Sequence, residues 1–296
     1  MSPKTKVILF LVLTIGLSAL SYIPILVSGS LYGTGGLFML TLMWSPGLAA
    51  IVTQLIATRS LRGLGWKPGP FRWLGLAYIL PVLYGLPVYV FVWLTRLGGL
   101  PNPELVDRLA EMAPNLAAPL RMAAFLLVSA TVVVLVSLLT ALGEEIGWRG
   151  LFVPELAKMT GFTKAALISG AVWAAWHMPA LFFTDYSAGG VPGWYATACF
   201  TLMVVTASFA YAWLRLKSGS LWPAALLHAS HNLFILNVFD DLNIITSVTP
   251  FITSETGIGL VITGLISAYL FWRRRGELPQ PDSAPQEQRI PSPALP

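Results

Sequence analysis

The stretch MAAFLLVSATVVVLVSLLTALGEEIGWRG, residues 122–150, decides the fold class of this chain. Residues 122–142 carry no charge, and about 20 apolar residues are enough for an α-helix to cross the hydrocarbon core of a bilayer. Glu144 and Glu145 follow at once, and Arg149 comes soon after. A charged side chain in hydrocarbon costs about 2.5 kcal/mol or more unless it faces an interior cavity with partners. The stretch therefore predicts a membrane-spanning helix that ends in candidate functional residues.

The composition of the whole chain indicates the same class. Of its 296 residues 56% are hydrophobic and only 10% are charged, against about 25% charged in soluble proteins. The single Cys199 excludes an internal disulfide and a cysteine-rich zinc cluster. The net charge of +5 comes from short loops beside apolar segments rather than from one basic face, which argues against nucleic acid as a partner.

Apolar segments of spanning length recur along the chain, and they predict an all-α, polytopic transmembrane bundle of about eight spans. The first is longer than the apolar region of a signal peptide and lacks a small-residue cleavage site, so we expect a retained helix. The predicted spans are residues 7–27, 36–57, 73–94, 122–142, 165–183, 194–214, 221–239 and 257–272.

Loop charges predict the orientation, because Lys and Arg accumulate on the cytoplasmic side. With both termini in the cytoplasm, only Arg96, Arg108 and Arg121 fall outside. The expected location is the cell (inner) membrane, with the lipid bilayer as surroundings. The positive residues expected inside are Lys4, Lys6, Arg59, Arg62, Lys67, Arg72, Arg149, Lys158, Lys164, Arg215, Lys217, Arg273, Arg274, Arg275 and Arg289.

Outside the spans, two segments have simple interpretations. Asn102, Pro103 and Glu104 form an N-cap signal, which predicts a short interfacial helix running to Met112. We expect residues 1–275 to form one integral-membrane domain. Residues 276–296 are polar and contain six prolines, which predicts a disordered cytoplasmic tail.

The Glu-Glu pair forms the first candidate motif. On a helix Glu145 and Arg149 lie four residues apart and can form an ion pair, whereas Glu144 points about 100° away and stays available for another role. The alternative is a charge cluster that merely anchors the helix end.

All three histidines lie in apolar segments. His177 follows Trp173 by one helical turn, and a lone histidine there can serve simply as an interhelical hydrogen-bonding group. His228 and Asn232 share a helix face, with His231 to one side, and their alternative role is helix packing.

Together these residues supply what peptide hydrolysis needs: a carboxylate, a histidine that shares protons near neutral pH, and donors for an oxyanion. Other proteolytic chemistries lack their motifs, since the chain contains neither H-E-x-x-H nor G-x-S-x-G.

Three motifs in this order resemble those of the CAAX protease and bacteriocin-processing family of intramembrane proteases, also called the Abi family, whose prokaryotic members resemble type II CAAX prenyl endopeptidases. They are Glu-Glu-x-x-x-Arg at 144–149, aromatic-x-x-x-His at 173–177 and His-x-x-x-Asn at 228–232. The resemblance covers a protease core of about residues 122–237. The family usually has Phe where Trp173 stands, a difference that we expect to alter packing more than chemistry.

The resemblance implies a role for each matched residue. Glu144 would activate a water with help from His177, while His228 and Asn232 would hold the oxyanion. Glu145 and Arg149 would then be supporting residues, together with Trp173 and His231. Family members are commonly described as metalloproteases, and Glu144, His177 and His228 would be the zinc ligands. The preferred mechanism needs no cofactor, because no His-x-x-x-His pair is present.

The implied function is an intramembrane endopeptidase acting on a membrane-embedded or lipidated, CAAX-like peptide or protein, in a chamber that opens to the cytoplasm. Alternatives are a non-catalytic bacteriocin-immunity or membrane scaffold protein, and a proton-coupled transporter. The pattern specifies neither the natural substrate nor an oligomeric state.

Overall fold

The computed structural model describes residues 1–33, 35–186 and 190–279, and within them the chain is helical and contains no strand. This confirms the predicted all-α class. The helices of the first half are α1 (Pro3–Ser28), α2 (Leu37–Thr58), α3 (Phe71–Leu94), α4 (Pro103–Met112), α5 (Ala118–Val128), η1 (Ser129–Val133) and α6 (Val134–Glu145). Those of the second half are η2 (Ile146–Phe152), α7 (Val153–Phe183), α8 (Gly193–Ser218), α9 (Trp222–His231), η3 (Asn232–Phe239), α10 (Asp240–Leu242), α11 (Thr249–Ile252), α12 (Ile258–Arg273) and η4 (Arg274–Glu277).

Within the described residues, five helical runs are long and apolar enough to cross a membrane, which makes the chain a multi-pass membrane protein. They are Pro3–Ser28, Leu37–Thr58, Phe71–Leu94, Ala118–Phe183 and Gly193–Ser218. The run Ala118–Phe183 has 66 residues and contains two of the predicted spans. The last two predicted spans are helical as α9 with η3 and as α12, so eight spans remains a prediction.

The fourth predicted span does not end at Leu142. The helix continues through α6, η2 and the first part of α7, and the chain turns back at Gly161, whose φ of 75° and ψ of 174° interrupt α7. Glu144 lies 17 residues before Gly161 and His177 lies 16 residues after it. At 1.5 Å per residue both lie about 25 Å along their helices from the turn, which lets Glu144 and His177 lie at a similar depth.

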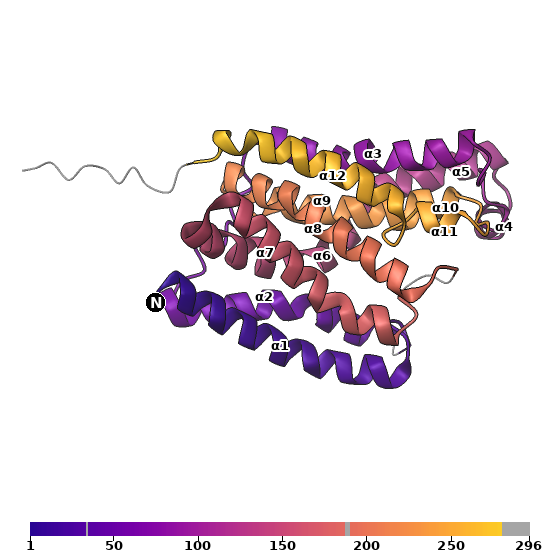
Figure 1. The fold of residues 1–296 in the computed structure, drawn as a ribbon. Helices are drawn as coiled ribbons and strands as arrows, with labels where there is room; N and C mark the ends of the chain where they lie inside the picture. Colours follow the sequence, from indigo (N-terminus) through magenta and orange to yellow (C-terminus); the bar gives the residue numbers. More distant parts are fainter. Residues whose placement is uncertain (34, 187–189, 280–296) are drawn as a thin grey trace, which may run out of the picture.

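Helix α8 lies inside the bundle, between α7 and α12 (Figure 1). In its apolar window 67% of the residues are buried, against 33% in α1, so α8 contributes most to the core. The short helix α4 begins as predicted, because the side chain of Asn102 accepts the backbone N–H of Glu104 at 3.1 Å. Helix η4 extends to Glu277, two residues into the predicted tail, and residues 280–296 lie outside the described residues.

Helices α2 and α6 approach closely at glycines. A Cβ atom on Gly47 would meet the carbonyl oxygen of Gly143, and one on Gly147 would meet Pro46. Small residues at helix contacts allow backbones in a membrane to pack without a gap. This crossing holds the Glu-Glu motif against α2.

We expect Gly47→Ala to destabilise the protein by about 1–3 kcal/mol, because the added methyl group overpacks the crossing with Gly143. The measurement is the thermal unfolding midpoint of the purified protein in detergent. Gly16→Ala is the matched control, since a Cβ at Gly16, also inside a helix, meets no atom within 4 Å. Equal midpoints for the two variants would contradict the close crossing.

Candidate active site

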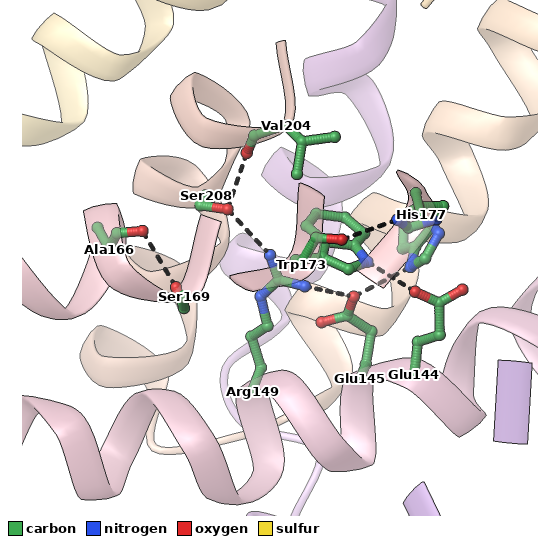
Figure 2. Close-up of polar contacts among 10 residues, drawn as sticks. Glu144, Glu145, Arg149, Ala166, Ser169, Trp173, His177, Val204 and Ser208 are labelled. Carbon is green, nitrogen blue, oxygen red and sulfur yellow. Dashed lines mark hydrogen bonds and ion pairs between the residues drawn. The ribbon is translucent and has the colours of Figure 1, made fainter. Parts of the chain in front are cut away.

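The four residues expected to be catalytic lie around one cavity of about 500 Å³. Glu144 is near the end of α6, His177 is on α7, His228 is on α9 and Asn232 begins η3. Trp173 and His231 line the same cavity. Figure 2 shows Glu144 and Glu145 on one helix, facing Trp173 and His177, which lie on α7 after the turn at Gly161. The fold therefore brings the three motifs to one place.

Arg149 forms the buried ion pair that the spacing predicts, with Nη1 donating to Glu145 Oε1 at 2.8 Å. Both side chains are fully buried. The guanidinium lies over the rings of Trp173 and Tyr211, 4.2 Å from each ring centroid. The sequence-based assignment of Arg149 to a cytoplasmic loop is therefore wrong. Arg149 lies inside the bundle and compensates the charge of Glu145 there.

Trp173 contacts the candidate base directly. Its indole Nε1–H donates to Glu144 Oε2 at 2.7 Å, and the Glu144 side chain is buried (Figure 2). A phenylalanine at this position has no donor. The structure thus gives Trp173 a contact with Glu144 that the sequence did not indicate, in addition to its packing.

His177 and His228 each use Nδ1 to fix the orientation of the ring. His177 Nδ1–H donates to the carbonyl oxygen of Trp173 at 2.9 Å, since a carbonyl only accepts. His228 Nδ1–H donates to Glu145 Oε1 at 3.0 Å. In both rings Nε2 remains for a water or a substrate. Glu145 thus orients His228 as well as binding Arg149, a role that sequence reasoning missed.

Two π-helical segments flank the site. η2 begins directly after Glu145, and η3 begins at Asn232, whose carbonyl oxygen accepts from Asn237 Nδ2 at 2.7 Å. Such widened turns occur frequently at functional sites.

A second polar group lies farther along the cavity wall and was not anticipated from the sequence. His231 Nε2 contacts Glu255 Oε1 at 2.9 Å, and the hydroxyl of Tyr186 donates to Glu255 Oε2 at 2.9 Å. Tyr84 hydrogen-bonds the other ring nitrogen of His231. Glu255 could have been noticed as an acidic residue just before the last apolar segment. His231 therefore has hydrogen-bond partners that differ from those of His177 and His228.

The described part of the chain contains no group of three or more His, Cys, Asp or Glu side chains that could hold a metal ion. The zinc set Glu144, His177 and His228 is thus not gathered as ligands, although the three residues share the cavity. The residues as placed do not fit a three-ligand zinc site.

Comparison with known proteins shows what the part of the chain with these motifs is similar to. Residues 126–234 match the family described as type II CAAX prenyl endopeptidase Rce1-like. The chain is also 30% identical over 146 residues to CAAX prenyl protease 2 of Methanococcus maripaludis. That alignment covers 47% of this chain and 51% of the relative, so the chain spans about half the length of the curated relative that it matches. The resemblance indicated by the three motifs is confirmed.

Proposed function

We propose that this chain is an intramembrane endopeptidase, because residues 126–234 match the Rce1-like family of type II CAAX prenyl endopeptidases. Its substrate is a lipidated or membrane-embedded polypeptide. The observation that carries the proposal is the buried carboxylate of Glu144 in a cavity that also presents His177, His228 and Asn232. A packing role alone would not require all four polar groups to face one cavity in an apolar bundle.

In the proposed reaction Glu144 takes a proton from a water molecule, and the resulting hydroxide attacks the carbonyl carbon of the scissile bond. His177 Nε2 accepts the other water proton in a hydrogen bond, because Nδ1–H is bound to the carbonyl of Trp173. The tetrahedral intermediate then collapses, the C–N bond breaks, and the proton on Glu144 passes to the leaving amine. The products are an amine and a carboxylic acid, which loses its proton to become the carboxylate.

Oxyanion stabilisation comes from His228 and Asn232. Because His228 Nδ1–H donates to Glu145, its Nε2 donates to the oxyanion only when the ring is an imidazolium. The carboxylate of Glu145 stabilises that cation. The side-chain amide of Asn232 supplies the second donor. Such preorganised donors contribute most where water is excluded.

The experiment that tests the function uses purified protein reconstituted in lipid vesicles. The substrate is an internally quenched peptide with a farnesylated CAAX terminus, and the matched control is the same peptide without the lipid. We expect release of the last three residues from the farnesylated peptide and slower cleavage of the control, since the lipid concentrates the peptide at the bilayer. Failure to cleave either peptide would favour the scaffold alternative, and equal rates would refute a lipid-dependent substrate.

The Glu144 mechanism as proposed uses no metal. We expect 1,10-phenanthroline to leave the cleavage rate unchanged. A thermolysin sample treated in parallel verifies that the chelator is effective. Loss of activity that added zinc restores would overturn the metal-free mechanism.

Trp173→Phe is expected to lower kcat by about tenfold, because a hydrogen bond to a charged group contributes about 1.5–3 kcal/mol. The phenylalanine ring still covers Arg149, so stability should change little. Trp222→Phe is the matched control, since the indole of Trp222 donates to the carbonyl of Trp66 away from the cavity. An unchanged kcat in Trp173→Phe would show that the indole N–H does not position Glu144.

A further inference from the structure

The two ends of the bundle differ strongly in charge. The start of α1 and the end of α12 lie at one end, and α4, α10 and α11 lie toward the other (Figure 1). We call the first of these the basic end, because thirteen of the described Lys and Arg residues lie there with only two acidic residues, Glu155 and Glu277. The thirteen are Lys4, Lys6, Arg59, Arg62, Lys67, Arg72, Lys158, Lys164, Arg215, Lys217, Arg273, Arg274 and Arg275. The opposite, acidic end carries Glu104, Asp107, Glu111, Asp185, Asp240, Asp241 and Glu255, with Arg96, Arg108 and Arg121.

This asymmetry sets the orientation in the membrane. Lys and Arg near the ends of spans favour the cytoplasmic side, whereas acidic residues contribute little. The basic end, with the start of α1, is therefore expected in the cytoplasm. The acidic end then faces the opposite compartment.

The cavity extends from the catalytic residues toward the acidic end. Leu31 and Tyr32 follow α1, Tyr186 follows α7 and Glu255 precedes α12, and all four line the cavity. Two of these loops are joined at the acidic end, because Ser30 and the backbone N–H of Leu31 donate to Asp185. These hydrogen bonds, of which the one from Ser30 has the largest effect, hold the pKa of Asp185 below its ordinary value. The carboxylate of Asp185 therefore stays charged there. Among the described lining residues, none comes from a loop at the basic end.

Toward the basic end the cavity has a closed floor. The Glu145–Arg149 pair is fully buried, and Arg215 Nε donates to the carbonyl oxygen of Arg149 at 2.7 Å. The indoles of Trp148 and Trp213 are buried as well. These buried side chains pack between Glu144 and the basic end.

The cavity also reaches the lipid on one side. Helices α2 and α6 touch at Gly47 and Gly143, and nearer the acidic end Met39 of α2 and Val136 of α6 both line the cavity. Val136 is 59% exposed. An apolar chain in that half of the bilayer can therefore reach the cavity between α2 and α6.

We propose that the cavity receives its substrate from the leaflet and the aqueous side opposite to the termini, which makes the protein a peptidase for membrane-anchored polypeptides exposed on the extracytoplasmic side. The substrate class in this inference rests on the proposed function. The side from which the substrate enters rests on the geometry of the cavity. Cytoplasmic termini and a cytoplasmic opening cannot both hold in this fold. The charge asymmetry favours cytoplasmic termini, so the opening is expected on the opposite side of the membrane.

The test is labelling of single cysteines with a membrane-impermeant sulfonated maleimide in right-side-out and inverted membrane vesicles. Cys199 is first replaced by alanine, because it is the only native cysteine. Tyr32→Cys probes the mouth, where Tyr32 is 67% exposed, and Thr140→Cys probes the cavity wall. Arg62→Cys, on an exposed loop at the basic end, is the matched control. Ser137→Cys, also on the wall, serves if the Thr140 variant does not fold.

We expect the mouth and wall cysteines to react in right-side-out vesicles and Arg62→Cys to react only in inverted vesicles. Reaction of the wall cysteine only in inverted vesicles, its failure to react in either, or labelling of all three from one side would overturn the proposal. Adding the farnesylated peptide to each vesicle type separates the two proposals. Labelling as expected without cleavage refutes the peptidase but keeps the direction, whereas cleavage only in inverted vesicles refutes the direction alone.

Discussion

Glu144→Gln is expected to reduce kcat for the farnesylated peptide by a factor of about 10²–10⁴, the contribution typical of a general base. Glutamine has nearly the same shape, and its amide oxygen can still accept the indole N–H of Trp173. It cannot take a proton from water. The protein should therefore fold normally and lose the chemical step, which kcat and the thermal unfolding midpoint measure separately.

The matched control is Glu155→Gln, the same exchange at a buried glutamate that pairs with Lys6 and Lys158 outside the cavity. It should leave kcat unchanged. Undiminished cleavage by Glu144→Gln would remove Glu144 from the mechanism. Collapse of the unfolding midpoint together with activity would indicate a structural role for its charge instead.

Arg149→Met should destabilise the protein by about 3–5 kcal/mol, the cost of leaving one partner of a buried ion pair uncompensated. Methionine fills much of the space between Trp173 and Tyr211 but leaves the charge of Glu145 without its cation. The measurement is the unfolding midpoint in detergent. Because Glu145 also binds His228, we expect kcat to fall in whatever fraction stays folded.

An exposed ion pair provides the comparison. Arg108 and Asp241 are 2.6 Å apart, but their side chains are 54% and 36% exposed, so Arg108→Met should cost less than about 1 kcal/mol. The double variant Glu145→Gln with Arg149→Met should recover part of the stability lost in the single variant, because no unpaired charge remains. Equal midpoints for Arg149→Met and Arg108→Met would show that the buried pair contributes little to stability.

Much of the architecture follows from local sequence. Uncharged runs such as residues 122–142 predict membrane helices, because length and apolarity alone meet the demands of a bilayer. The i, i+4 spacing predicts the pair of Glu145 and Arg149, which the structure contains. The N-cap of α4 is likewise local, since its hydrogen bond joins residues two apart.

The end of the fourth helix could not be predicted in the same way. Charges at 144, 145 and 149 looked like the start of a loop, yet the helix continues to the turn at Gly161. Arg149 remains in the bundle because Glu145, Trp173 and Tyr211 surround it. Two of those partners come from other helices, so residues 122–150 alone indicate the pairing with Glu145 but not the enclosure by Trp173 and Tyr211.

By itself the sequence determined a helical membrane protein and the candidate side chains for peptide hydrolysis, because apolar length and residue chemistry are local properties. Tertiary structure decided which groups touch Glu144, how Glu145 serves two partners, and toward which end the cavity extends. The contacts concerned join residues 29 and 83 positions apart. They depend on how each helix is rotated and where helices cross, which close packing of the whole bundle sets and no single segment encodes.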